Sequence, residues 1–220
     1  MKKIVDFTNG ANVFVVLGQV GSGKTHLTLN HKGRKLVISF DGSYSTLKGH
    51  ESEITVVTPD IADYNDADKL VSEIDELAKG CSLVVFDNLS AAEATLVNAI
   101  TDGKLGSNTD GRAAYGTVQK IFSKFANWAI HFNADTLFTL WSLTTEDGKE
   151  EPAMNMKAFN AVAGYAKLVS RTEVGFDGYS VVVNPDSRGV IKNRLADKIK
   201  KQTIKNDDYW KAINFAKGEK

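Results

Sequence analysis

Residues 12–25 decide the fold, and they read Asn12-Val13-Phe14-Val15-Val16-Leu17-Gly18-Gln19-Val20-Gly21-Ser22-Gly23-Lys24-Thr25. The run that ends at Leu17 is apolar and rich in β-branched residues, which is typical of a buried parallel strand. The residues from Gly18 match the pattern G-x-x-x-x-G-K-[ST]. In this pattern successive backbone N–H groups wrap around a phosphate, and glycines allow the backbone angles and the close approach. The stretch therefore predicts a phosphate-binding loop between a strand and a helix.

The polar residues of the loop have expected roles. Lys24 is expected to reach the β- and γ-phosphates of a nucleotide, and the Thr25 hydroxyl is expected to bind Mg²⁺. The helix that begins near Lys24 adds the partial positive charge of its N-terminus. The residues expected to contact the nucleotide are Gly18, Gln19, Val20, Gly21, Ser22, Gly23, Lys24, Thr25 and His26.

A second buried strand supplies an acidic residue for the same site. Residues 82–86 are mostly apolar and lead to Asp87, where a carboxylate can orient Mg²⁺ and its water ligands. Asn88 follows, so the Asp-Glu pair of the AAA+ branch of P-loop proteins is absent, which favours the RecA-like branch.

The remaining pattern alternates strands and helices. Further strands are expected at 36–40, 54–58 and 136–141, and helices at 24–31, from Asp63 to Gly80, and from Val118 to Phe132. Short antiparallel strands are expected near 168–174, 179–184 and 189–192. This order predicts an α/β fold with a mostly parallel sheet, helices on both faces and an antiparallel C-terminal extension. We expect a nucleotide-binding core at 1–195, with a basic helix or tail at 196–220 in the same domain.

Charge is balanced in total and uneven along the chain. The 220 residues include 27 Lys and Arg and 27 Asp and Glu, which excludes a polycationic DNA-coating protein. Residues 50–110 hold thirteen acidic residues and three lysines, a net charge of −10. Residues 188–220 hold ten basic and four acidic residues, a net charge of +6. Solvated helix faces, a nucleic-acid contact, or charge complementarity between subunits would each explain this pattern.

The cysteine content and the N-terminus favour a cytoplasmic protein. Cys81 is the only cysteine, so an intrachain disulfide cannot form. The N-terminal apolar run is short and broken by polar residues, so neither a signal peptide nor a membrane span is expected.

The chain resembles RecA-like P-loop ATPases, in particular small phage-encoded ATPases of DNA recombination and single-strand annealing. The resemblance rests on GQVGSGKT at 18–25, VVFDN at 84–88, TLFTLW at 136–141 and VSRTEVGFDGYSVVVNPDSRGVIKNR at 169–194. It implies an ATP- and Mg²⁺-dependent homo-oligomer that acts on single-stranded DNA with other replication or recombination proteins in the host cytoplasm.

The resemblance also implies roles for residues outside the loop. Lys192 and Arg194 are similar to the Lys-x-Arg pair that RecA-like subunits extend into a neighbour's nucleotide, and Arg171 is a weaker candidate. Two solvated cations on an edge strand are the alternative for Lys192 and Arg194. A polar residue that senses the γ-phosphate is implied at Thr139 or Ser142.

One position departs from the family pattern. RecA-like enzymes usually place a glutamate just past the strand after the first helix, and Ser43 stands there. Asp41 or Glu93 can replace it, and the sequence does not choose between them. Binding of ATP and Mg²⁺ is therefore predicted more directly than fast hydrolysis.

Contacts to DNA have two candidate locations. In the family they come from two loops, which by position are 102–116 and 144–157. These loops carry a single aromatic residue, Tyr115, and the basic residues Lys104, Arg112, Lys149 and Lys157. The basic tail with Tyr209 and Trp210 is the other candidate, although Trp210 and Phe215 can instead anchor a terminal helix on the core.

Two other functions stay open. A nucleotide-binding assembly or loader module with little or no turnover is compatible with Ser43. A small-molecule kinase needs an arginine-rich lid, but Arg34 and Arg112 are the only arginines before Arg171.

Overall fold

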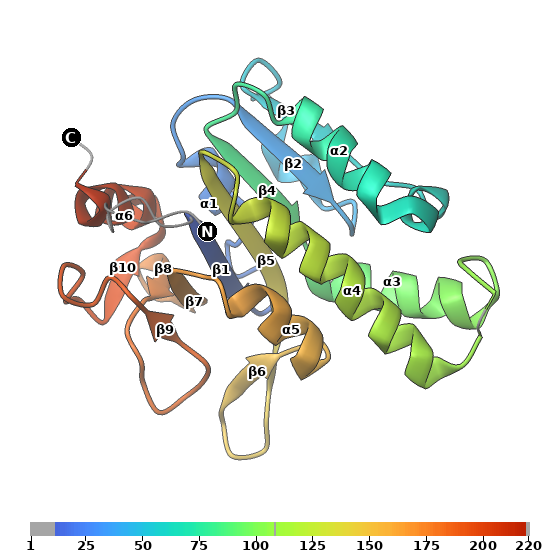
Figure 1. Cartoon of the computed structure of the whole chain (residues 1–220). Coiled ribbons are helices and arrows are strands. Elements are labelled where there is room, and N and C mark those ends of the chain that lie inside the picture. The colour runs from blue at the N-terminus through green and yellow to red at the C-terminus, as the bar shows by residue number, and fades with distance from the viewer. Residues whose placement is uncertain (1–11, 108, 219–220) are drawn as a thin grey trace, which may run out of the picture.

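The protein is built on a single β-sheet, and both faces of this sheet are buried. The computed structural model describes residues 12–107 and 109–218. The strands are β1 (Val13–Gly18), β2 (Lys35–Ser39), β3 (Ile54–Val57), β4 (Leu83–Asp87), β5 (Asp135–Thr144), β6 (Glu150–Pro152), β7 (Leu168–Gly175), β8 (Gly178–Val182), β9 (Lys192–Asn193) and β10 (Thr203–Lys205). Their order is β10-β8-β7-β1-β5-β4-β2-β3, with β6 beside β5 and β9 beside β7 (Figure 1).

Helices cover both faces of this sheet. They are α1 (His26–Leu29), α2 (Ala67–Leu77), α3 (Leu89–Thr101), α4 (Gly111–Ala129), α5 (Met156–Ala163) and α6 (Tyr209–Lys217). Figure 1 shows α2, α4 and α5 along one face of the sheet. The alternating side chains of β1 show the division: Val13, Val15 and Leu17 belong to the core under α2–α5, whereas Phe14 and Val16 belong to the core under α1 and α6.

The central strands are parallel, which confirms the predicted α/β architecture. β1 pairs in parallel with β5 and β7, and β4 pairs in parallel with β5 and β2. Residues 168–174 were expected to form an antiparallel strand, and this expectation is wrong for one of the two neighbouring strands. β7 is antiparallel to β8 but runs parallel to β1, with Leu168 opposite Phe14, because its first five residues are buried in the centre of the sheet.

Helix boundaries differ most from the sequence-based expectations. The helix expected at 24–31 is four residues long, and α3 and α5 were not expected. Much of α3 is buried, so its sequence lacks the amphipathic period that marks a helix. The loop expected at 102–116 ends earlier, because Asp110 accepts hydrogen bonds from the N–H groups of Arg112 and Ala113 and caps α4. The loop expected at 144–157 contains β6 and the start of α5.

The C-terminal segment packs on the same core. Tyr209 and Trp210 are buried, and the Trp210 indole N–H donates to the Leu27 carbonyl at 2.7 Å. These two rings are therefore not available to stack on DNA bases. The alternative that Trp210 and Phe215 anchor the terminal helix holds for Trp210 but is wrong for Phe215, whose side chain is 73% exposed. Within the described residues, every helix is too short or too polar to cross a bilayer.

Phe86 is central to the aromatic core, and its truncation tests the packing. Its ring is fully buried and lies 4.7 Å from Phe138 and 5.0 Å from Phe125, measured between centroids. We expect Phe86→Ala to lower the free energy of unfolding by about 3–5 kcal/mol, measured by urea denaturation. The matched control is Phe176→Ala, because Phe176 is fully exposed and its loss should change stability by less than about 0.5 kcal/mol. Equal effects of the two substitutions would contradict this packing.

Candidate functional site

The carboxyl ends of the central strands converge on one cavity, which is where ligands bind in open α/β sheets. The cavity has a volume of about 590 Å³. It is lined by the phosphate loop and by residues that follow β2 and β4, together with Trp141 and Tyr179. The lining residues are Val20, Gly21, Ser22, Gly23, Lys24, Thr25, His26, Asp41, Ser43, Ser45, Thr46, Asp87, Asn88, Trp141 and Tyr179.

The glycines of the loop have separate structural reasons. Gly21 and Gly23 have φ angles of 76° and 87°, a region that side chains with a Cβ rarely adopt. Gly18 is required by space, because a Cβ there would lie 2.0 Å from the Thr172 hydroxyl oxygen. The loop conformation therefore depends on these positions.

Lys24 is held inside the loop. Its ammonium donates to the carbonyl oxygens of Gly18 and Gln19, at 2.8 and 2.7 Å. Burial lowers the pKa of Lys24 to about 8, and the negative charges of Asp87, Asp41 and Glu150 oppose this shift. A partly desolvated lysine in this loop is suited to bind polyanionic phosphates.

Asp87 forms the second half of the site. One carboxylate oxygen accepts a hydrogen bond from Thr25 Oγ1 at 3.0 Å, and the other accepts a hydrogen bond from Thr139 Oγ1. Burial raises the pKa of Asp87, and the two hydroxyl donors oppose this rise. A carboxylate next to a hydroxyl provides the hard oxygen ligands that Mg²⁺ prefers, with phosphate oxygens of a nucleotide completing its shell. The residues present therefore fit Mg²⁺, which Thr25 and Asp87 would hold.

The strand order explains why Thr139 reaches this carboxylate. β5 lies between β1, which leads into the phosphate loop, and β4, which ends at Asp87, so the Thr139 side chain is next to this carboxylate. Of the two residues considered as sensors, Thr139 contacts Asp87. Ser142 instead donates to Glu150 at 2.8 Å.

The structure also separates the two candidates for the missing glutamate. Asp41 and Ser43 both line the cavity, and Asp41 accepts hydrogen bonds from Ser43 and from the Asn88 side-chain amide, the latter at 3.2 Å. Glu93 is buried in α3 and accepts from the Asn155 N–H at 2.8 Å, just before α5. It is not among the residues that line the cavity. Asp41 is therefore the acidic residue available beside Asp87.

Two residues that contact the phosphate loop could not be identified from the sequence. Asn206 is buried, and its side-chain amide donates to the Gly23 carbonyl at 3.1 Å across 183 residues of chain. Tyr179 of β8 lies over the same glycine, because a Cβ on Gly23 would be 3.0 Å from its ring. Both contacts arise from the C-terminal strands folding beside β1, which a local motif does not show.

The predicted basic residues lie elsewhere. Arg171 is fully buried and paired with Glu173 and Asp186, at 2.9 and 2.7 Å, so it cannot extend to another subunit as considered above. Lys192 and Arg194 both donate to the Gly164 carbonyl, at the C-terminal end of α5. They lie beside the first residues of β7, at the amino ends of the parallel strands, whereas the phosphate loop follows the carboxyl end of β1. The fold does not bring them to the cavity of their own chain.

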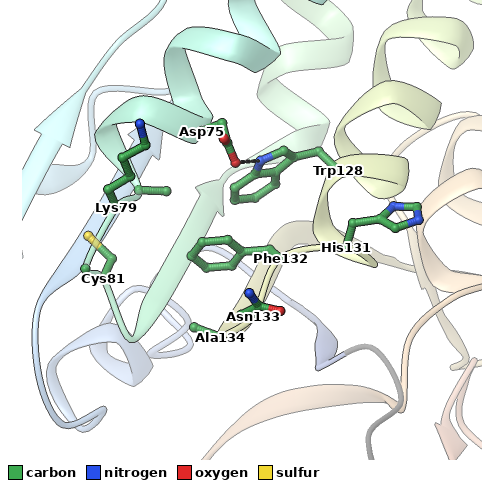
Figure 2. Close-up of a pocket in the computed structure, with 10 residues that line it drawn as sticks. Asp75, Lys79, Cys81, Trp128, His131, Phe132, Asn133 and Ala134 are labelled. Atoms are coloured by element: carbon green, nitrogen blue, oxygen red, sulfur yellow. Dashed lines mark hydrogen bonds between the residues drawn. The ribbon is translucent and has the colours of Figure 1, made fainter.

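A second cavity, of about 370 Å³, lies at the opposite ends of β4 and β5 (Figure 2). Figure 2 shows the Trp128 indole N–H donating to Asp75, at 2.8 Å, with Phe132 beneath the indole. The neighbouring Cys81 thiol has a pKa raised by burial, which makes it a poor nucleophile. This position, at the amino ends of the strands, is remote from the phosphate loop.

One protein-family model and one solved structure are similar to this chain. A family model described as an AAA domain matches residues 11–195. A search of curated protein sequences gives no significant match. Among solved structures, a KaiC-like protein, PH0186 from the hyperthermophilic archaeon Pyrococcus horikoshii OT3, is similar at 12% identity, with 82% of each chain covered and a TM-score of 0.47. Since the family match spans most of the chain, including the phosphate loop and Asp87, the protein belongs to the AAA domain family of P-loop ATPases.

Proposed function

We propose that this protein is a Mg²⁺-dependent ATPase that works as a homo-oligomer on single-stranded DNA, in recombination or replication. The observation that carries the proposal is the contact of Thr25 and Thr139 with Asp87 beside the desolvated Lys24. The resemblance to phage-encoded annealing ATPases supports the DNA role.

The residues of the cavity divide the work of binding. The backbone N–H groups of the loop and the Lys24 ammonium would hold the β- and γ-phosphates. Mg²⁺, when bound, neutralises charge on the phosphate oxygens. The buried hydrogen bonds of Asp87 hold the Thr25 hydroxyl in place, so the oxygen ligands are oriented before the nucleotide arrives.

Asp41 would take the role of the catalytic glutamate, because this chain has Ser43 at the position where RecA-like enzymes usually have that glutamate. Its carboxylate lines the cavity, and hydrogen bonds from Asn88 and Ser43 fix its direction. A carboxylate in this position can polarise water for attack on the terminal phosphate.

The oligomer is proposed because Lys192 and Arg194 lie away from the cavity of their own chain. Supplied to a neighbouring subunit, a positioned ammonium and guanidinium would stabilise the charge that develops on the transferred phosphoryl group. Hydrolysis would then depend on assembly. A loader module with little turnover is the second candidate, favoured by Ser43 at the usual glutamate position.

Substitution of Asp41 tests its role. We expect Asp41→Asn to lower the ATP hydrolysis rate by about 100-fold or more, with ATP affinity nearly unchanged, because the amide cannot accept a proton from water. The measurement is steady-state phosphate release with Mg²⁺ and single-stranded DNA. The matched control is Glu93→Gln, which should retain the wild-type rate. A slow Glu93→Gln and an active Asp41→Asn would reverse the assignment, and a wild type without turnover would favour the loader module.

The lowered pKa of Lys24 predicts proton uptake on ATP binding. With a pKa of about 8, the amine is mostly neutral at about pH 9, and adjacent phosphates should restore its charge. The binding enthalpy at about pH 9 should therefore vary with the ionisation enthalpy of the buffer. Lys24→Arg, titrated at higher ATP concentration, should lose this dependence because the guanidinium stays protonated. A buffer-independent enthalpy in the wild type would contradict the lowered pKa.

Mixing two inactive variants tests the contribution of a neighbouring subunit. Lys24→Ala removes the binding site, and the double variant Lys192→Ala/Arg194→Ala removes the cations. An equal mixture should recover up to roughly a quarter of wild-type hydrolysis, because some interfaces join an intact site to intact cations. Size-exclusion chromatography of the mixture checks that assembly itself is unchanged. If mixtures stay inactive although they assemble, the cations do not act in trans.

A further inference from the structure

A lysine-lined groove lies at the C-terminal edge of the sheet, apart from the ATP cavity. Its volume is about 550 Å³, and it is bounded by residues 198–201, β10 and α6. Of the described residues that line it, five are lysines and one, Asp208, is acidic. The lysines are Lys198, Lys200, Lys201, Lys205 and Lys211.

Among the residues that the structure describes, few acidic partners neutralise this charge. Lys211 is 4.0 Å from Asp208, and both side chains are largely exposed, so this pair contributes little. Lys198 donates to the Ala216 carbonyl at 2.7 Å, and this partner is uncharged. In the described part of the chain, Lys200 and Lys201 form no ion pair. The groove therefore presents a concentrated positive potential to solvent.

An exposed aromatic ring lies in the same groove. Phe215 lines it with a side chain that is 73% exposed, on a helix whose other aromatic residues, Tyr209 and Trp210, are buried. Lysines on an edge strand can protect the sheet from aggregation, but that function explains only Lys205. It does not explain lysines outside the strand, and an exposed phenyl ring would counteract it.

We propose that this groove binds single-stranded nucleic acid, with the lysines along the phosphate backbone and Phe215 stacked on a base. Proteins that bind single strands without sequence preference combine these two features, and an unpaired base has an open face for stacking. A duplex would present phosphates to the lysines but no base face to Phe215. This proposal extends the proposed function by placing the DNA on a surface other than the loops at 102–116 and 144–157.

The groove adjoins the ATP site through the chain itself. Lys205 lines the groove, and the next residue, Asn206, donates to the Gly23 carbonyl of the phosphate loop. Occupancy of the groove can therefore affect the loop over a short path. This step of the inference rests on the proposed ATPase, whereas binding to the groove does not.

The test is the binding of fluorescein-labelled oligothymidylate, followed by fluorescence anisotropy over a range of KCl concentrations without nucleotide. We expect Lys200→Glu/Lys201→Glu to weaken binding at least tenfold and to make the slope of log affinity against log salt less steep by about 1.4. The matched control is Lys104→Glu/Lys149→Glu, which makes the same charge change in the two loops. A larger loss of binding in this control than in the groove variant would overturn the proposal.

Phe215→Ala separates base stacking from charge. Because the ring is exposed, the variant should fold normally, lose about tenfold in affinity for oligothymidylate, and bind heparin as the wild type does. Equal losses for heparin and oligothymidylate would contradict stacking. Tighter binding to anionic lipid vesicles than to oligothymidylate would assign the groove to a membrane surface. Self-association that Lys200→Glu/Lys201→Glu abolishes, without DNA binding in the wild type, would assign it to a second copy.

Measurements of ATP hydrolysis distinguish a failure of DNA binding in the groove from a failure of the proposed ATPase activity. Lys200→Glu/Lys201→Glu should retain basal hydrolysis without DNA and lose the stimulation by oligothymidylate. If the wild type binds oligothymidylate but never hydrolyses ATP, the proposed ATPase fails and the groove stands. If the wild type hydrolyses ATP but does not bind oligothymidylate in the groove, only the groove proposal is overturned.

Discussion

The site depends on one buried carboxylate. Asp87 is almost fully removed from water, and two threonine hydroxyls, Thr25 at the start of α1 and Thr139 in β5, donate to its two oxygens. A buried charge is costly unless hydrogen bonds satisfy it, so the strand order that places β5 between β1 and β4 is also what makes Asp87 tolerable. The same hydrogen bonds orient the hydroxyl and the carboxylate toward the phosphate loop. Stability and ligand geometry thus come from one arrangement.

Much of the fold was predictable because its strands are short, apolar and separated by clear breaks. The strand that leads into the phosphate loop and the strand that ends at Asp87 were both found within one or two residues of their bounds. The helix α3 was missed because burial on most sides leaves no amphipathic period. α5 was missed because Asn155 caps it after a polar stretch that resembles a loop. The parallel pairing of β7 with β1 depends on the tertiary structure, and no local sequence pattern indicates it.

Prediction of the site was limited in the same way. Glycine spacing and the apolar strand before Asp87 indicated the phosphate-binding half directly. The choice between Asp41 and Glu93 required knowing that Glu93 is held by the Asn155 N–H, whereas Asp41 is held by Asn88 at the cavity. The sequence left Trp210 open between a DNA contact and an anchor on the core, because its burial depends on a face of β1 that is distant in sequence. Contacts between distant segments decided each of these cases.

The brace from Asn206 to Gly23 has a consequence for the order in which the protein matures during synthesis. The phosphate loop is translated early, but the residue that supports it follows 183 positions later. N-terminal parts of a chain leave the ribosome and begin to fold first. The loop is therefore made well before its brace. Until residue 206 has emerged and docked, the Gly23 carbonyl lacks the side-chain hydrogen bond that it accepts in the folded chain.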